Sequence, residues 1–395
     1  MYAYLDNAAT TMLSPAAKAA MLPMLDENYG NPSSLHRYGR QAAAALQSAR
    51  ERIAACINAD PVEITFTSGG SEADNQAIFS AAMQGVQAGK KHIVSTQIEH
   101  HAVLHYLRAL ESEGFTVTLL PVEPETGLIR LSDLEAALTD GTCLVTVMMA
   151  NNEVGTIQPI EEIAKLCRAR KIPFHTDAVQ AVGHVPVDVR ALGVDMLSLA
   201  AHKFHGPKGA GALYCRRGSV PLRPVLLGGA QERGRRAGTE NLPAVVGMAA
   251  ALEEAVADLP ETSARIAGYR DQLIDGLLKI GRAHLNGDRA RRLPGNVSFC
   301  FEGLEGESLL LLLDDRGIAA SSGSACTSGS LEPSHVLLAL GRPHEVAHGS
   351  LRLSLSRYTT QEEVGHALAA IPPVVEYLRE ISPVWEKILM EEGEL

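Results

Sequence analysis

The sequence predicts an α/β protein in which a mostly parallel sheet covered by helices is followed by a smaller α+β part. Between residues 60 and 215, short apolar runs alternate with segments of helical length, which is the pattern of βα repeats. Past a helix expected at Leu242–Ala257 the order changes, because strand-like residues 296–301 and 350–356 are separated by helices. We place a boundary near Pro260, since 395 residues are enough for two or three structural units.

Local signals predict the individual elements. Pro15 is a good first helical residue, so we expect a helix from there to about Asp26, and the alanine-rich residues 41–55 favour a second helix. Ser132 and Glu135 have the spacing of a capping box at the start of another helix. The other expected strands are residues 63–66, 92–95, 116–120, 142–149, 173–176, 196–200 and 211–215, and the other expected helices are residues 72–88, 101–113 and 160–170.

Composition argues against several functional classes. A net charge of −11 offers no basic patch for nucleic acid, and no apolar run reaches the about 18 residues of a membrane span. The first residues, M-Y-A-Y-L-D-N, do not resemble a secretory signal, so we expect a cytoplasmic protein. The six cysteines contain no C-x-x-C pair, and the His202-x-x-His205 pair lacks a third ligand, so we expect neither a disulfide framework nor a metal site.

Lys203 occupies a position at which a lysine could act as a nucleophile. Residues 196–200 form a short apolar strand and Gly206-Pro207 ends regular structure, so Lys203 lies on a tight turn at a strand end. Partial burial there would lower the pKa of its amine and allow attack on a carbonyl. Taken alone, the position favours an ordinary surface lysine, because most lysines are solvated.

Two distant stretches favour the chemical interpretation. Asp177 and Gln180 follow the strand at residues 173–176, and ligands of open α/β sheets bind at such carboxyl ends. Residues 68–72, S-G-G-S-E, form a glycine turn between a strand and a helix, an arrangement that can hold a phosphate. A phosphate cradle, an acid and a lysine are together what pyridoxal phosphate requires.

These motifs, which run from Tyr4 to Trp385, resemble the class-V aminotransferase family of fold-type-I pyridoxal-phosphate-dependent transferases, and most closely its cysteine desulfurase branch. The resemblance implies that residues 15–258 form a large cofactor-binding domain and that residues 1–14 plus 259–395 form a small domain. It implies conversion of L-cysteine to L-alanine, with the sulfur passing to an enzyme cysteine as a persulfide. It further implies a homodimer and a sulfur-acceptor protein, such as an iron–sulfur scaffold.

The resemblance also assigns roles to single residues. Lys203 would bind the cofactor covalently, and His100 would stack on its ring and move protons, although a histidine at a helix start is also a good cap. Arg352 would bind the substrate carboxylate, although an arginine on a strand is commonly a surface salt bridge. The remaining cofactor contacts would come from Gly70, Ser71, Asn152, Asp177, Gln180 and His202, with Thr239 reaching the phosphate of the other subunit and Asn152 also touching substrate.

The segment that decides the reaction type is residues 320–330, A-S-S-G-S-A-C-T-S-G-S, because it is small, polar and carries Cys326. It resembles the catalytic loop of desulfurases, where Cys326 would become the persulfide. Together with A-H-G-S-L-R and S-R-Y-T-T it looks nearest the nitrogen-fixation type of this branch, with the housekeeping type as a close alternative. Selenocysteine lyase, another class-V aminotransferase and a non-catalytic binding protein remain as alternatives.

One position departs from the family pattern. Three residues before Lys203 the family commonly has a hydroxyl side chain, whereas this chain has Ala200. We therefore expect one phosphate hydrogen bond to be missing and the cofactor to be held less tightly.

Overall fold

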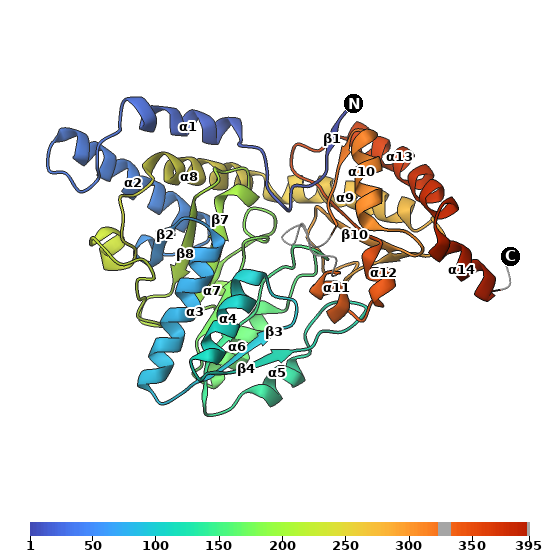
Figure 1. The fold of residues 1–395 in the computed structure, drawn as a ribbon. Coiled ribbons are helices and arrows are strands. Elements are labelled where there is room, and N and C mark those ends of the chain that lie inside the picture. The colour runs from blue at the N-terminus through green and yellow to red at the C-terminus, as the bar shows by residue number, and fades with distance from the viewer. Residues whose placement is uncertain (323–332, 393–395) are drawn as a thin grey trace.

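A computed structural model describes residues 1–322 and 333–392 (Figure 1). Its largest element is a seven-stranded sheet with the strand order β2-β8-β7-β6-β5-β3-β4. Only β8 runs against its neighbours, and the other pairs are parallel, so the predicted mostly parallel sheet is confirmed. The strands are β2 (Ile64–Thr67), β3 (His92–Thr96), β4 (Thr116–Leu120), β5 (Thr142–Thr146), β6 (Phe174–Asp177), β7 (Met196–Ala200) and β8 (Gly211–Cys215).

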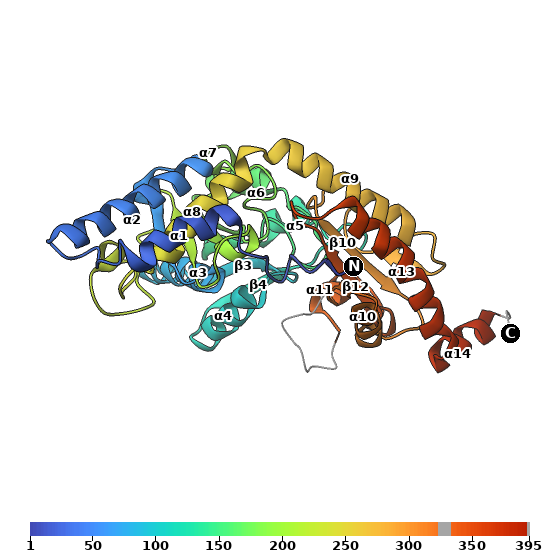
Figure 2. The same ribbon diagram turned by 90° about the horizontal axis from the view of Figure 1, so that it is seen from above.

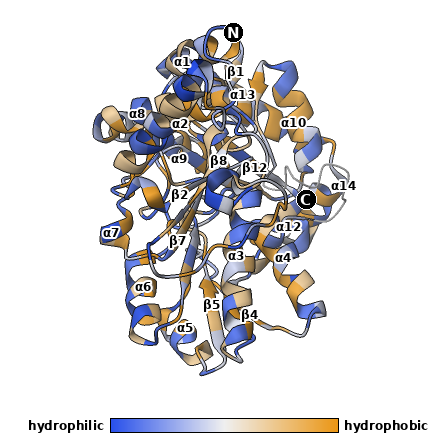
Figure 3. Cartoon of the chain, turned by 90° about the vertical axis from the view of Figure 1, so that its left-hand side faces the viewer, coloured by the Kyte–Doolittle hydropathy of each residue, from blue (hydrophilic) through white to orange (hydrophobic). Residues whose placement is uncertain are grey.

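Helices cover both faces of this sheet, and side-chain alternation along the strands explains why. Ile93 and Leu144 pack into one buried cluster with helices α3 and α4, whereas their neighbours Val94 and Val145 pack into a second cluster. Figure 3 shows β5 in the hydrophobic colour between helices of mixed character. The helices of this part are α1 (Pro15–Asp26), α2 (Arg37–Cys56), α3 (Gly70–Gln87), α4 (His101–Ser112), α5 (Leu131–Ala137), α6 (Ile160–Ala169), α7 (Val189–Leu192) and α8 (Leu242–Ala257), with 3-10 turns η1 (Pro61–Glu63), η2 (Ala201–Lys203) and η3 (Gln231–Gly234).

The C-terminal part has its own sheets and its own apolar cluster. Figure 2 shows its helices α13 and α14 at one side of the molecule. An antiparallel sheet has the order β12-β10-β9, and β1 pairs in parallel with β11. Its elements are β9 (Ala283–Leu285), β10 (Asn296–Phe301), β11 (Ile318–Ala319), β12 (Ser350–Ser354), α9 (Leu259–Leu277), α10 (Gly306–Asp315), α11 (His335–Ala339), α12 (His344–His348), α13 (Gln361–Glu380) and α14 (Pro383–Glu392), together with the N-terminal β1 (Ala3–Tyr4).

The N-terminus crosses to this C-terminal part. Ala3 pairs with Ile318, and Ala3 and Leu5 are buried in the same cluster as Phe299. Asp258 joins α8 to α9, close to the boundary expected near Pro260. The division into residues 15–258 and residues 1–14 plus 259–395 stays a prediction.

Three local predictions were wrong. The capping box does not form, because α5 begins at Leu131 after Arg130, and Ser132 turns its hydroxyl toward Asp133. Helix α2 begins at Arg37 rather than residue 41, because the His36 ring caps it by accepting from the Gly39 amide. Strand β5 ends at Thr146 rather than residue 149, after which the chain turns into the site.

None of the helices in residues 1–322 and 333–392 has the length and apolar character to cross a membrane.

Candidate active site

A cavity of about 350 Å³ lies at the carboxyl ends of the parallel strands. Asp177 is the last residue of β6 and Ala200 the last residue of β7, so the strands deliver these side chains to one edge, where α/β sheets bind their ligands. The cavity is lined by Ala8, Ala9, Gly70, Ser71, Asp74, Glu99, His100, His101, Met148, Asn152, Glu153, Asp177, Val179, Gln180, Ala200, His202, Lys203, His335 and Arg352.

Lys203 is directed into this cavity from η2, the turn that follows β7. Its Nζ donates to the carbonyl oxygens of Ala8 at 2.5 Å and of Ala9 at 2.8 Å, and the residue is half-buried. The turn is tight because the amide of Gly206 donates back to the carbonyl of Ala201. The alternative of a solvated surface lysine is therefore wrong.

Asp177 and Gln180 lie beside Lys203, as predicted. Asp177 is 5% exposed, and its Oδ1 accepts the amide of Val179 at 2.9 Å. Burial raises the pKa of Asp177 to about 6, opposed by the Val179 hydrogen bond and by the charge of Lys203. Gln180 donates from Nε2 to the same Ala8 carbonyl that Lys203 binds, at 3.0 Å.

Two further buried carboxyls lie in the cavity wall that the sequence patterns did not reveal. Asp74 is 1% exposed, and its Oδ1 has no hydrogen-bond partner among the described residues. Glu99 accepts from the Thr96 hydroxyl at 2.7 Å and from the Met148 amide at 3.0 Å. Burial raises the pKa of Asp74 well above its usual range and that of Glu99 to about 8. One signal for Asp74 was its place on the buried face of α3, among Ala73, Ala77 and Ile78.

The predicted phosphate cradle is at the start of α3. A Cβ added to Gly70 would meet Val179 Cγ2 at 2.6 Å, so a larger residue would fill this end of the cavity. His202 lies opposite, with Nδ1 3.2 Å from the Thr10 hydroxyl. Burial, followed by the charges of Lys203 and Lys208, lowers the pKa of His202 to about 4, so its ring is neutral at pH 7. This space at a helix N-terminus suits a phosphate group.

His100 satisfies both interpretations of its position. It caps α4, because its Nδ1 accepts the Ala102 amide at 3.1 Å, and it also lines the cavity. Burial first, then the charges of Lys203 and His335, lowers its pKa, which favours a neutral ring that can accept a proton. The neighbouring rings of His101 and His335, 4.8 Å apart, also line the cavity, and the sequence did not suggest either of them.

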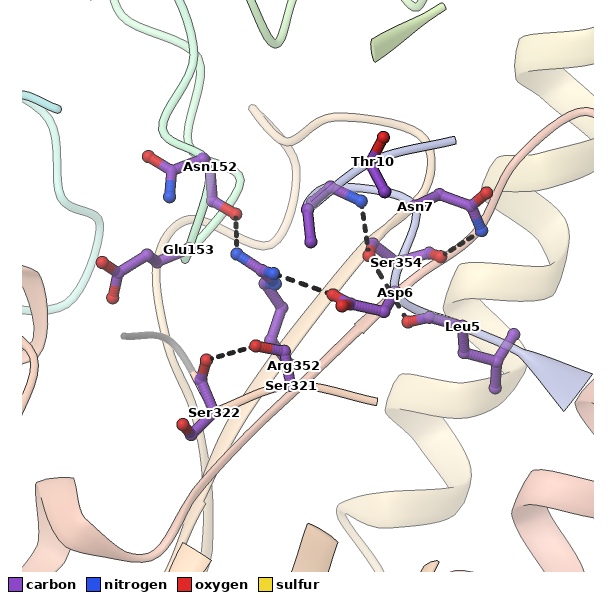
Figure 4. A network of polar contacts seen from close by, with 12 residues as sticks. Leu5, Asp6, Asn7, Thr10, Asn152, Glu153, Ser321, Ser322, Arg352 and Ser354 are labelled. Atoms are coloured by element: carbon purple, nitrogen blue, oxygen red, sulfur yellow. Dashed lines mark hydrogen bonds and ion pairs between the residues drawn. The ribbon is translucent and has the colours of Figure 1, made fainter. Parts of the chain in front are cut away.

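Arg352 enters the cavity from β12, on the C-terminal side (Figure 4). It is 2% exposed, so the alternative of a surface salt bridge is wrong. Its Nη1 donates to the Asn152 carbonyl at 3.0 Å and its Nη2 pairs with Asp6 Oδ1 at 2.9 Å, while Nε has no partner among the described residues. Glu153, which the sequence also did not suggest, lines the cavity next to Asn152.

Thr239 is not part of this cavity wall, and the position of Cys326 is not described. Thr239 is exposed and lies outside the lining of its own chain's cavity. Cys326 lies outside the described residues. The five other cysteines are 56, 143, 167, 215 and 300, and burial raises the pKa of each thiol.

Together these residues fit pyridoxal phosphate. The space beside Gly70 accepts a phosphate, the buried Arg352 Nε has no hydrogen-bond partner among the described residues, and Lys203 and Asp177 supply an amine and an acid. The fold and site therefore define a pyridoxal-phosphate-dependent enzyme of the α/β class.

The chain belongs to the aminotransferase class-V family, whose profile matches residues 3–366. Enzymes of this family use pyridoxal phosphate. The chain is 53% identical over 384 residues to a cysteine desulfurase IscS of Methanosarcina thermophila, a match that covers 97% of this chain and 94% of the relative. It is 50% identical to a cysteine desulfurase of a Nostoc species, covering 96% and 94% of the two chains. A solved NifS-like protein superimposes with a TM-score of 0.90 at 39% identity, covering 96% of this chain and all of that one.

Proposed function

We propose that this chain is a cysteine desulfurase that converts L-cysteine to L-alanine and carries the sulfur on Cys326. The observation that carries the proposal is that Lys203 of η2, Asp177 of β6 and Arg352 of β12 line one cavity, although β6 and β12 belong to different sheets. An amine, an acid and a guanidinium in one cavity suit an amino acid bound by its carboxylate to Arg352. The names of the relatives support the same substrate.

The residues of this chain would divide the work as follows. When bound, pyridoxal phosphate supplies an electron-poor ring that withdraws electrons from the substrate Cα. Asp177 would pair with the ring nitrogen and Gln180 with its phenolic oxygen, while Gly70, Ser71 and His202 would hold the phosphate. The Lys203 Nζ would hold the proton that leaves the substrate Cα, and the neutral His100 ring is placed to receive a proton from the same region. Asn152 would position cofactor or substrate beside Arg352.

The sulfur step needs a thiolate. Burial raises the pKa of Cys56, Cys143 and Cys300 to about 11 and of Cys167 to about 12, so these thiols are poor nucleophiles at pH 7. Attack of the Cys326 thiolate on the substrate sulfur would break its bond to Cβ and form a sulfur–sulfur bond. Cβ would gain a proton, so L-cysteine and the enzyme thiol give L-alanine and the enzyme persulfide in equal amounts.

The test is to incubate the cofactor-loaded protein with L-cysteine and a thiol reductant and to quantify alanine and sulfide. Native protein should release both in equal amounts. Cys326→Ala should lose sulfide release while keeping the visible absorbance of the bound cofactor, and Lys203→Ala should lose that absorbance. Undiminished sulfide from Cys326→Ala would reject the role of Cys326. A keto acid in place of alanine would favour an aminotransferase, and turnover of selenocysteine alone would favour a selenocysteine lyase.

We also propose that the chain acts as a homodimer in which Thr239 reaches the phosphate of the partner subunit. Apolar side chains are exposed in the loop between α1 and α2, where Leu35 is 90% exposed, and in the loop before η3, where Leu227 is 84% exposed, and such residues are typical of an interface. A sedimentation equilibrium mass of one chain would contradict the dimer.

The fate of the sulfur belongs to the same proposal. A persulfide needs an acceptor, and the resemblance points to an iron–sulfur scaffold protein in the cytoplasm, with a role in nitrogen fixation. Transfer of radioactive sulfur from L-[35S]cysteine to an added scaffold protein would test the acceptor. Normal diazotrophic growth of a deletion strain would contradict the nitrogen-fixation role, and recovery of the protein outside the cytoplasmic fraction would contradict the location.

A further inference from the structure

A second cavity lies at the edge of the large sheet opposite to the candidate active site. It has a volume of about 420 Å³, which is within the range of small-molecule sites. Thr142, the first residue of β5, and Pro173, which precedes β6, line this second cavity. Met148 and Asp177, at the other ends of the same strands, line the first one. The two cavities are therefore separate sites at the two ends of the same strands.

Positive charge predominates in the wall of the second cavity. Its titratable side chains, among the described residues, are Lys90, Arg168, Lys171, Arg216, Asp195 and Cys143. Asp195 is already engaged, because it pairs with Arg216 and accepts the Phe174 amide at 2.9 Å. Burial raises the pKa of the Cys143 thiol to about 11, so it is uncharged at pH 7. The three other cations form no ion pair within the described residues, although the whole chain has a net charge of −11.

The ends of α3 and α6 account for only part of this positive charge. Both helices end at the cavity, and cations stabilise helix C-termini, each of which carries about half a negative charge. The last carbonyls of both helices already have partners, since Gly85 accepts the Lys90 amide at 2.8 Å and Cys167 accepts the Ile172 amide at 2.9 Å. Two helix ends offset about one charge, so about two positive charges are left for a ligand.

Two of the cations are fixed at the end of α6. Lys171 follows Arg170, the C-cap, and has a φ of 54°, a conformation in which glycine is favoured and a lysine costs stability. Arg168 donates from Nη2 to the Gly193 carbonyl at 3.0 Å, and a Cβ on residue 193 would meet this nitrogen at 2.6 Å. Residues in such unfavourable backbone conformations are concentrated at binding sites.

Gln84 supplies an unused acceptor in the same wall. Its Oε1 is buried without a hydrogen-bond partner among the described residues, while its Nε2 lies 3.4 Å from the Ser219 carbonyl. A buried acceptor without a donor is unfavourable, so a ligand with a donor would be stabilised here. A hydroxyl group can donate to this oxygen, whereas a phosphate dianion cannot.

We propose that the second cavity binds a small phosphorylated polyol, such as a sugar phosphate. Arg168 and Lys171 bind the doubly charged phosphate, and Lys90 adds a third positive charge. Gln84 accepts a hydrogen bond from a hydroxyl of the same molecule. This site is independent of the proposed desulfuration, because it shares no lining residue with the first cavity.

The test is a calorimetric titration of the cofactor-loaded protein with glycerol 3-phosphate in phosphate-free buffer. Native protein should bind one molecule per chain and should not bind glycerol, which carries no charge. Arg168→Gln should weaken binding about tenfold or more, because it removes a hydrogen bond between charged groups. The matched control is Lys165→Gln, which removes the same charge from an exposed position of α6 outside the cavity and should leave the affinity nearly unchanged.

Two further variants separate binding from folding. Lys171→Gly should raise the melting temperature, because glycine adopts this φ without strain, and should nevertheless weaken binding. A lysine with only a structural role would not show that loss. Gln84→Leu should weaken the binding of glycerol 3-phosphate but not that of inorganic phosphate, since only the former has hydroxyls.

The inference would be overturned if native protein showed no saturable binding of glycerol 3-phosphate at millimolar concentrations. Unchanged affinity in both Arg168→Gln and Lys171→Gly would also overturn it, because binding would then occur elsewhere. Binding of an oligoglutamate peptide without binding of glycerol 3-phosphate would replace the small-molecule site by a surface for an acidic partner. Alanine and sulfide release is measured separately, so none of these results affects the proposed function.

Discussion

Ala200 is the single residue whose identity should limit cofactor affinity. It is the last residue of β7 and lines the cavity, 3.7 Å from where a Cβ on Gly70 would lie. Ser198, two residues earlier, cannot supply the missing hydroxyl, since its Oγ lies 2.9 Å from His175 Nε2 below the cavity floor.

Ala200→Ser should therefore bind pyridoxal phosphate more tightly. A hydrogen bond to a charged group contributes about 1.5 kcal/mol or more, which is about tenfold in the dissociation constant. Titration of cofactor-free protein with pyridoxal phosphate, followed by absorbance, measures the change. Equal dissociation constants for native protein and Ala200→Ser would show that no phosphate oxygen lies within reach of position 200.

At this scale the sequence could predict residues that directly follow a strand. Lys203, Asp177 and Gln180 were predicted because strand ends of a parallel sheet meet at one edge, and all three line the cavity. The partners of Lys203 could not be predicted, because the Ala8 and Ala9 carbonyls are nearly two hundred residues away and have no side-chain signature. The sequence did not suggest Glu153 either, because a glutamate in a loop is unusual only when its side chain is buried, and the sequence does not show that burial.

At the scale of elements, one buried ion pair joins α2 to η3. Arg50 Nη2 lies 2.5 Å from Glu232 Oε1, and both side chains are almost fully buried. The same carboxylate accepts the Phe66 amide of β2 at 3.0 Å, while Arg50 Nη1 donates to the Ile64 carbonyl at 2.9 Å. Glu232 has a left-handed backbone, with φ of 48°, so this pair fixes the segment that leads toward Thr239.

Glu232→Gln should destabilise the protein by about 3 kcal/mol or more, because it leaves the Arg50 charge buried without a counter-charge. Denaturant unfolding measures the loss. The matched control is Arg289→Ala, which breaks an ion pair with Asp275 whose side chains are 50% and 62% exposed. That control should change stability by less than about 1 kcal/mol. A loss for Glu232→Gln no larger than for the control would mean that the buried pair contributes nothing net.

The sequence predicted most helices and strands correctly, because the periodicity of apolar residues and the glycines that end regular structure are local signals. It misplaced ends where a contact distant in space or an unusual cap decides the boundary. His36, a residue rarely read as a cap, starts α2 four residues early, and Arg130 rather than Ser132 precedes α5. The predicted strand at residues 142–149 was too long, because the chain leaves β5 after Thr146 and the Met148 amide then donates to the Glu99 carboxyl.

At the scale of the whole molecule, buried acids and buried histidines set the pH dependence of stability. Burial holds the pKa of Asp177 near 6, of Glu153 near 7 and of Glu99 near 8. A raised carboxyl pKa means that the folded chain binds the proton more tightly than the unfolded chain, so stability falls as pH rises through this range. The lowered pKa values, about 3 for His175 and about 4 for His202 and His205, act in the opposite direction, but only below pH 6.5.

The cofactor-free protein should therefore lose thermal stability between pH 6.5 and pH 8, where only the acids still titrate. Melting temperatures measured across this range by calorimetry test the prediction. Glu99→Gln should flatten the curve, because it removes the acid with the highest of these pKa values. A melting temperature that rises over the same range in native protein would contradict the assignment of these carboxyls as protonated in the fold.

The path of the N-terminal segment has a consequence for how the molecule is made. Ala3, Asp6 and Ala8 leave the ribosome long before their partners, because Ala3 pairs with Ile318, Asp6 binds Arg352 and the Ala8 amide binds Ser354. The segment whose carbonyls bind Lys203 is thus held by Ser354 only after β12 has been translated. The site of chemistry is completed near the end of biosynthesis, and a chain cut short before β12 leaves its N-terminus without these partners.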